Sequence, residues 1–156
     1  MRRALLLCLL LLLSLMGCRG ADASPRELFE RFSAAYPLEA GVLYDSEAGK
    51  SDPTYLDPLR LSALLRRPDG SYDAEDIASA FLYLGAAGDA HRELLILRCH
   101  GRDEAREVAA LCAARAELLK KSVAAEARVL CVRRTVLLFV LSDNARAERL
   151  LLRMLS

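Results

Sequence analysis

The sequence predicts an α+β fold: an antiparallel four-stranded sheet with two helices on one face, preceded by an N-terminal helix and an irregular cover segment. Two observations carry this prediction. From residue 77 onward, short apolar runs alternate with stretches of helical periodicity in the order strand, strand, helix, strand, strand, helix. Between residues 36 and 70, prolines and glycines recur too often for a regular element of any length.

The N-terminal helix is predicted to begin after Ser24, because serine is a good N-cap and Pro25 is tolerated in a first turn. Its apolar stripe at helical spacing consists of Leu28, Phe29, Phe32 and Tyr36. A second, short helix is expected over residues 58–65. We interpret residues 25–70 as a cover for the core, because this segment carries too many large apolar residues to stay solvated.

Four strands are predicted from runs rich in leucine, valine, isoleucine and alanine: residues 77–84, 93–99, 128–132 and 135–141. The helix between the second and third runs is expected to begin at Asp103, an N-cap candidate, and to end near Lys121. Ser142 and Asp143 are expected to cap the last helix.

The last of these strands is apolar on both sides over residues 136–141, which is typical of a strand buried on both faces. One face of the sheet is expected to carry the two helices. The other face therefore needs a cover, and residues 25–70 are the candidate within the chain. A partner protein is the alternative.

The N-terminus has the composition of an export signal. Arg2 and Arg3 precede an apolar, leucine-rich run over residues 4–16. The run is too short for a bilayer-spanning helix and fits the hydrophobic region of a signal peptide. It ends in Leu-Met-Gly-Cys at residues 15–18, which resembles the lipobox of bacterial lipoproteins. The resemblance implies that the Cys18 thiol receives a diacylglyceryl group and that the leader is cut just before it.

The resulting domain organisation is a signal peptide at 1–17, a lipidated tether at 18–24 and one domain at 25–156. We divide that domain into the helix and cover at 25–70 and the sheet-and-helix core at 71–156. A rival cut follows Ala21-Asp22-Ala23 and would release a soluble protein. It is the less well placed of the two, because Arg19 and its neighbours separate it from the apolar run.

Charge and composition argue against a nucleic-acid partner. Loss of Arg2 and Arg3 with the leader takes Lys plus Arg from 22 to 20, against 21 Asp plus Glu. The mature protein therefore has no large basic field to attract a polyanion. Tryptophan is absent and few residues are aromatic, which argues against a platform for stacking bases or sugars.

After lipidation of Cys18, three cysteines remain: Cys99, Cys112 and Cys131. An odd number cannot pair fully within one chain, and each has apolar neighbours, so we expect buried free thiols. One disulfide with one free thiol is the alternative.

The remaining motifs do not define a catalytic, cofactor or metal site. A zinc site that combines Cys99 and His100 with His91, Cys112 or Cys131 lacks the close cysteine pair typical of such sites. Gly49-Lys50-Ser51 lacks the first glycine and the helix of a P-loop, and is interpreted as a turn. The acidic residues between 69 and 76 miss the calcium-loop spacing. Arg133 and Arg134 are expected at a solvated hairpin tip, with anionic lipid or wall phosphate as the alternative contact.

Several short patterns resemble a known bacterial family. They are Tyr44-Asp45-Ser46, Tyr55-Leu56-Asp57-Pro58, Asp76-Ile77, residues 95–99, the alanine-rich stretch 105–119 and residues 136–143. Together they are similar to the lipoproteins grouped as domain of unknown function forty-three fifty-eight, frequent in Clostridia and their relatives. The resemblance covers about residues 24–156 and implies an anchored extracytoplasmic α+β domain. The family often has a glycine where this chain has Arg134, and it has no assigned activity to carry over.

The sequence thus predicts a lipid-anchored extracytoplasmic protein that acts as a non-catalytic binding or accessory module of the cell envelope. Its expected partners are the membrane, through Cys18, and an envelope protein. Two alternatives stay open. One is an envelope enzyme, such as a hydrolase, whose site is unrecognised, and the other is a carrier of a small ligand.

The anchor can be tested directly. Cys18→Ala removes the thiol that would carry the lipid, so labelling by a radioactive fatty acid and recovery in the membrane fraction should both be lost. Cys131→Ala is the matched control and should keep both. Membrane recovery of the Cys18→Ala chain after leader cleavage would contradict the lipobox.

Overall fold

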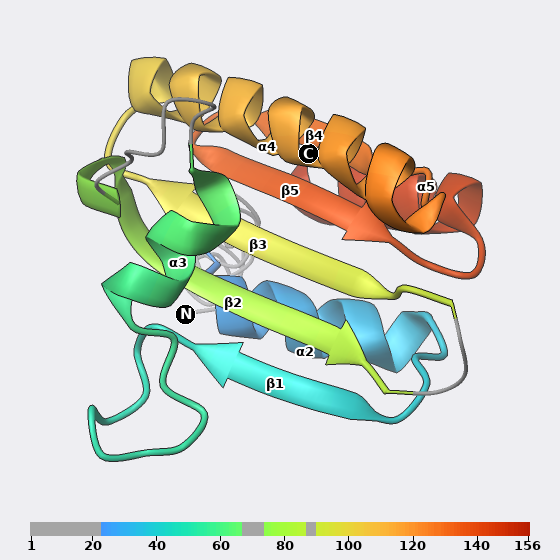
Figure 1. Ribbon diagram of the computed structural model, residues 1–156, viewed down its shortest axis with the longest axis horizontal. Helices are drawn as coiled ribbons and strands as arrows, with labels where there is room; N and C mark the ends of the chain where they lie inside the picture. Colours follow the sequence, from blue (N-terminus) through green and yellow to red (C-terminus); the bar gives the residue numbers. More distant parts are fainter. Residues whose placement is uncertain (1–22, 67–73, 87–89) are drawn as a thin grey trace, which may run out of the picture.

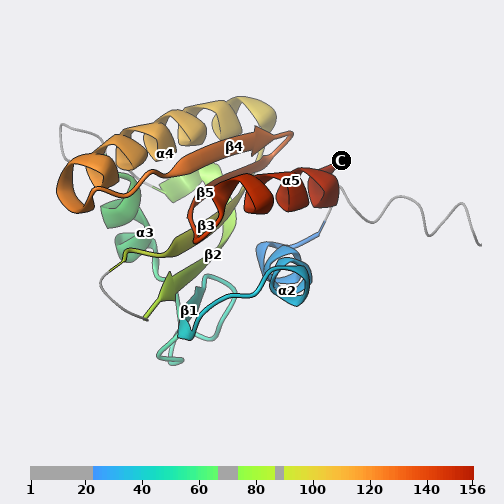
Figure 2. The same cartoon turned by 90° about the vertical axis from the view of Figure 1, so that its right-hand side faces the viewer.

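The computed structural model describes residues 23–66, 74–86 and 90–156. It has three layers, with a central sheet covered by helices on both faces (Figures 1 and 2). The strands are β1 (Gly41–Asp45), β2 (Ile77–Gly85), β3 (Glu93–Cys99), β4 (Arg128–Val132) and β5 (Thr135–Val140). The helices are α2 (Pro25–Ala35), α3 (Pro58–Leu65), α4 (Arg102–Val123) and α5 (Asn144–Leu155), with a 3₁₀ turn η1 (Ala74–Asp76). The predicted α+β class is confirmed.

The sheet has the strand order β1-β2-β3-β5-β4, and every neighbouring pair is antiparallel. The prediction of a four-stranded sheet is wrong, because the irregular segment contributes β1. This strand pairs with β2 from Gly41 opposite Gly85 to Asp45 opposite Phe81. Its first three residues are exposed at the sheet edge, so they lack the alternation that reveals a strand. The pairing also needs a glycine: a Cβ at Gly41 would lie 2.5 Å from the Leu84 carbonyl oxygen.

The prediction that two helices share one face is also wrong. α4 lies on one face of the sheet with α3, whereas α5 lies on the other with α2 (Figure 2). β5 explains this arrangement, because all six of its residues are buried and successive side chains point to opposite faces. Leu138 belongs to the core under α4, and Leu137 and Phe139 belong to the core under α5. Each face therefore needs a helix.

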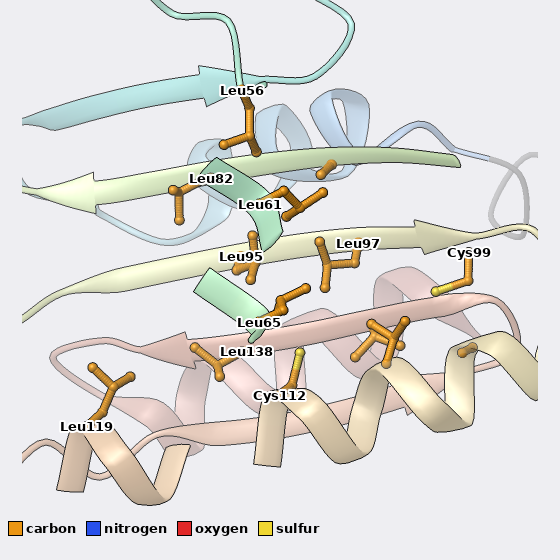
Figure 3. Packing of buried hydrophobic residues seen from close by; sticks show 14 of the residues in the cluster. Leu56, Leu61, Leu65, Leu82, Leu95, Leu97, Cys99, Cys112, Leu119 and Leu138 are labelled. Carbon is orange, nitrogen blue, oxygen red and sulfur yellow. The ribbon is translucent and has the colours of Figure 1, made fainter. Parts of the chain in front are cut away.

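The cover predicted for residues 25–70 is divided between the two faces. α2 packs on the α5 side, where Phe29 and Phe32 join the core. α3 packs on the α4 side through Leu61 and Leu65. Figure 3 shows Leu61 and Leu65 of α3 lying over the sheet. Residues 67–70 lie outside the described part of the chain.

The helix starts follow the expected capping chemistry in most places. Ser24 forms a reciprocal capping box with Glu27, with N···O distances of 3.2 and 2.8 Å. Asp143 caps α5 by accepting a hydrogen bond from the Arg146 N–H, as predicted. Asp103 is not an N-cap: α4 begins at Arg102 after Gly101, and Asp103 lies in its first turn, where its charge suits the helix dipole.

The β4–β5 hairpin has an unusual turn. Arg133 has a φ of 56°, in the left-handed region, and Arg134 does not share this positive φ. A positive φ at only the first of two central residues is the pattern of a type II′ turn, which favours glycine at that first position. The position that favours glycine in this chain is therefore Arg133, and Arg134 is the second central residue.

Replacing Arg133 by glycine should raise the free energy of unfolding by about 1 kcal/mol, because an L-residue in the left-handed region costs about that much. Urea denaturation of the two proteins measures the difference. Arg134→Gly is the control and should give no gain, because its backbone needs no glycine. Equal stabilisation by both variants would contradict this view of the turn.

Candidate functional site

The predicted lipidation residue, Cys18, lies outside the described residues, as do the rest of the leader and the tether as far as residue 22. Its role therefore stays a prediction. Within the described ranges, no helix is both long and apolar enough to cross a membrane.

A groove of about 500 Å³ that is open to solvent lies beside α3. Its lining comes from the loop between β1 and α3, from α3 itself, and from η1 with the first residues of β2. Apolar side chains make up most of the wall: Tyr55, Leu56, Pro58, Leu59, Leu61, Ala74, Ile77 and Ala78. Leu59 is 82% exposed, the most exposed of the large hydrophobic side chains in the described ranges. A leucine so placed offers apolar area to whatever enters the groove.

Hydrogen bonds fix the loop after β1, which lines the groove, against the sheet. Ser46 and Ala80 exchange two bonds: the Ala80 N–H donates to Ser46 Oγ at 2.7 Å, and the Ser46 N–H donates to the Ala80 carbonyl oxygen at 3.0 Å. The Leu56 N–H donates to the Asp45 carbonyl oxygen at 3.0 Å. Asp57 then caps α3 by accepting from the Arg60 N–H at 2.9 Å. The loop between β1 and α3, which forms one wall of the groove, is therefore positioned by hydrogen bonds to the backbones of β1 and β2.

The opposite wall is shaped by a β-bulge. The register between β2 and β3 shifts between Ile77 and Ser79, which leaves Ala78 unpaired and exposed in the groove. A bulge of this kind bends the strand and redirects its side chains.

The polar groups of the groove are acidic or neutral. Two carboxylates line it, Glu47 from the loop after β1 and Glu75 from η1, and three hydroxyl groups belong to Ser46, Ser62 and Ser79. The described lining includes no lysine, arginine or histidine. The groove therefore suits an apolar group that carries a positive charge.

A buried ion pair connects the sheet to α4. The Glu93 side chain is fully buried, and its carboxylate accepts two bonds from the Arg115 guanidinium, from Nη2 at 2.7 Å and from Nε at 3.0 Å. His91 Nε2 lies 2.9 Å from the same carboxylate. Arg115 also donates to the Leu64 carbonyl oxygen in α3, at 3.4 Å. One guanidinium therefore joins β3, α3 and α4.

Burial alone would raise the pKa of Glu93, but the hydrogen bonds from His91 and Arg115 and the charge of Arg115 outweigh it, and the pKa is lowered. Glu93 is therefore ionised in the folded protein at neutral pH. Sequence reasoning missed this cluster, although a signal was present. Arg115 follows Val108 and Cys112 on the apolar face of α4 and precedes Leu119, so it occupies a core position at helical spacing.

A second ion pair fixes α2 to the edge strand β1. The Asp45 side chain is 5% exposed and contacts Arg26 through Nε and Nη2, both at 2.6 Å. The same carboxylate accepts from the Glu47 N–H at 2.8 Å, which places Glu47 beside the groove. The Arg26 guanidinium also stacks on the Phe81 ring.

The three predicted free cysteines are unpaired in the structure. Cys99 and Cys112 are buried, and burial raises the pKa of each thiol to about 12. Both thiols are therefore protonated at neutral pH and are poor nucleophiles. Cys131 is exposed, contrary to the expectation that all three are buried, because β4 is an edge strand.

The other residues considered for chemistry do not converge. His100 is exposed, whereas the side chain of its neighbour Cys99 is buried. In the part of the chain that the structure describes, no three His, Cys, Asp or Glu side chains are grouped to hold a metal ion. Gly49, Lys50 and Ser51 lie in an exposed turn. Of the acidic residues, Glu75 and Asp76 form part of η1, and Asp69 and Asp73 lie outside the described ranges.

No protein-family model, curated protein or solved structure matches this chain. The family resemblance noted in the sequence therefore stays a prediction.

The Glu93–Arg115 pair predicts strongly non-additive stability. Arg115→Met leaves a buried carboxylate without its main partner and should cost about 3–5 kcal/mol. Glu93→Leu with Arg115→Met removes both charges and should cost clearly less than Arg115→Met alone. Urea denaturation of the two single variants, the double variant and the wild type measures the coupling.

The pH dependence provides the control. Since the folded pKa of Glu93 lies below its ordinary value of 4.5, the ionised carboxylate stabilises the fold above that value, and this contribution is lost as the pH falls through the lowered pKa. The wild type should therefore lose more stability on acidification than the double variant. Parallel acid curves for the two proteins would refute a stabilising role for the pair.

Proposed function

We propose that this protein is a lipid-anchored extracytoplasmic binding module of the cell envelope, and that the groove beside α3 holds a basic, apolar segment of an envelope partner protein. The observation that carries the proposal is the composition of the groove, an apolar wall with Leu59 at its rim and the carboxylates of Glu47 and Glu75. The anchor at Cys18 and the resemblance to the lipoprotein family are the sequence predictions on which its location depends.

The shape of the groove favours a protein segment over an enclosed ligand. Leu56, Leu61 and Leu65 fill the space between α3 and the sheet, as Figure 3 shows. The free volume lies beside α3 and is open to solvent. An open groove of this kind can take an extended or helical segment through one or two apolar anchors. A carrier of small molecules would instead need a site that encloses most of its ligand.

The polar clusters favour a binding role over catalysis. His91 contacts Glu93, which is the pairing that an acid–base dyad would need, but the Glu93 carboxylate is already held by two bonds from Arg115. None of His91, Glu93 and Arg115 lines the groove. An enzyme with an unrecognised site is thus the alternative that draws least support from the geometry.

Site-specific photo-crosslinking in the native cell tests the proposal. A photoreactive amino acid at Leu59 should capture one recurrent envelope protein, because this side chain lies at the groove rim. The matched control is Leu118, another exposed leucine, which lies on α4 away from the groove. The same partner captured from both positions would contradict a groove-specific contact.

Charge dependence sharpens the same experiment. Replacing both Glu47 and Glu75 by glutamine should reduce the crosslinking yield at position 59 severalfold, since the partner segment is proposed to be basic. Glutamine at both Glu107 and Glu117 on α4 removes equal charge and should leave the yield unchanged. A yield insensitive to the groove carboxylates would refute the basic partner.

A further inference from the structure

A second concave feature lies at the start of α4 and is lined by arginines. This hollow of about 320 Å³ is bordered by Arg102 and Arg106 from the first turns of α4 and by Cys131 and Arg133 from the β4–β5 hairpin. All three arginines are exposed. Arg106 pairs with Asp103 at 2.9 Å, but both side chains are largely exposed, so this bond is weak. The hollow is thus a concentration of positive charge on a protein whose overall charge is near zero.

The two sides of the hollow are held together by the fold. The Cys131 thiol donates to the Ala105 carbonyl oxygen in α4 at 3.7 Å. The left-handed backbone of Arg133 places an arginine at a turn position that favours glycine. Glycine at position 133 would give a more stable protein. A role in binding would explain why the chain has an arginine there instead.

The described chain begins at the same end of the domain. Arg98, near the end of β3, donates to the Ala23 carbonyl oxygen at 2.8 Å and pairs with Thr135, which directly follows the hairpin turn. The Cys99 N–H donates to the Arg134 carbonyl oxygen at 2.8 Å. Figures 1 and 2 both show the starts of α2 and α4 and the β4–β5 hairpin at one end of the sheet.

This proximity sets a distance limit. Four residues lie between Cys18 and Ala23, and the five residue-to-residue steps span about 18 Å at most in a fully extended chain. A lipid on Cys18 would therefore keep this end of the domain near the bilayer surface, where anionic headgroups attract nearby arginines.

We infer that Arg102, Arg106 and Arg133 form a docking surface for the headgroups of anionic phospholipids, which orients the domain with the start of α4 toward the membrane. The inference rests on the proposed anchor at Cys18. In this orientation the opposite end of the sheet, where α4 ends, faces away from the bilayer.

Fluorescence quenching in vesicles tests the orientation. The mature lipoprotein, purified from cell membranes, carries an environment-sensitive fluorescent amino acid at position 107, where the glutamate is exposed on α4 and does not line the hollow. The protein is reconstituted into vesicles of phosphatidylcholine, with or without phosphatidylglycerol, that contain headgroup-labelled quencher lipids. A comparison protein carries the same fluorescent amino acid at position 121, which lies about 21 Å from position 107 along α4 at 1.5 Å per residue.

We expect quenching at position 107 but not at position 121, and only with phosphatidylglycerol. The triple variant R102Q/R106Q/R133G should reduce the ratio of docked to undocked protein on the order of a hundredfold, since each arginine near an anionic surface contributes roughly fivefold. The control K120Q/K121Q/R128Q removes equal charge near the other end of α4 and should leave quenching at position 107 unchanged. Glycine at position 133 is compatible with the left-handed backbone, so the triple variant should fold.

Several results would overturn the inference. Equal quenching at position 107 in neutral vesicles would mean that the tether alone sets the orientation. Absence of quenching in a protein that still sediments with the vesicles would refute the arginine surface and leave the anchor standing. Displacement by millimolar inorganic phosphate would assign the hollow to a free anion. A chain that carries no lipid and does not sediment would refute the anchor and this inference together.

Discussion

The double burial of β5 is the constraint on which the rest of this structure depends. A strand whose side chains are apolar on both faces can be solvated on neither, so both faces of the sheet must be covered. The chain has two long helices after the sheet begins, and it uses one on each side. α3 and α2 complete the two covers, and the segment that contains them also supplies an edge strand.

Two ion pairs give these apolar layers a fixed geometry. Hydrophobic contacts are not directional, and a helix on an apolar sheet could slide or rotate at little cost. A buried carboxylate held by a bidentate arginine tolerates no such movement without the loss of its partner. Glu93 and Arg115 fix α4 and α3 relative to β3, and Asp45 and Arg26 fix α2 relative to β1. The walls of the groove beside α3 are positioned by both.

The two proposed binding surfaces have opposite character. The groove beside α3 is apolar with two carboxylates, whereas the hollow at the start of α4 is lined by arginines. If the arginines contact a membrane and the groove contacts a protein, the charges keep the two roles separate, because an anionic bilayer repels Glu47 and Glu75. The short distance between Ala23 and the hairpin is what connects the second surface to the proposed anchor.

The sequence alone determined the positions of most elements. Helical spacing, strand-like apolar runs and the caps Ser24 and Asp143 are local signals, because residues close together in the chain form each of them. It also shows the lipobox pattern at Cys18, which the described residues leave untested. Only the tertiary structure decided which face α5 covers, that residues 41–45 pair as an edge strand, and that Glu93 meets Arg115. Each of these depends on contacts between residues far apart in the chain. The groove and the arginine hollow follow the same reasoning, because side chains from separate elements become one surface only when the sheet brings those elements together.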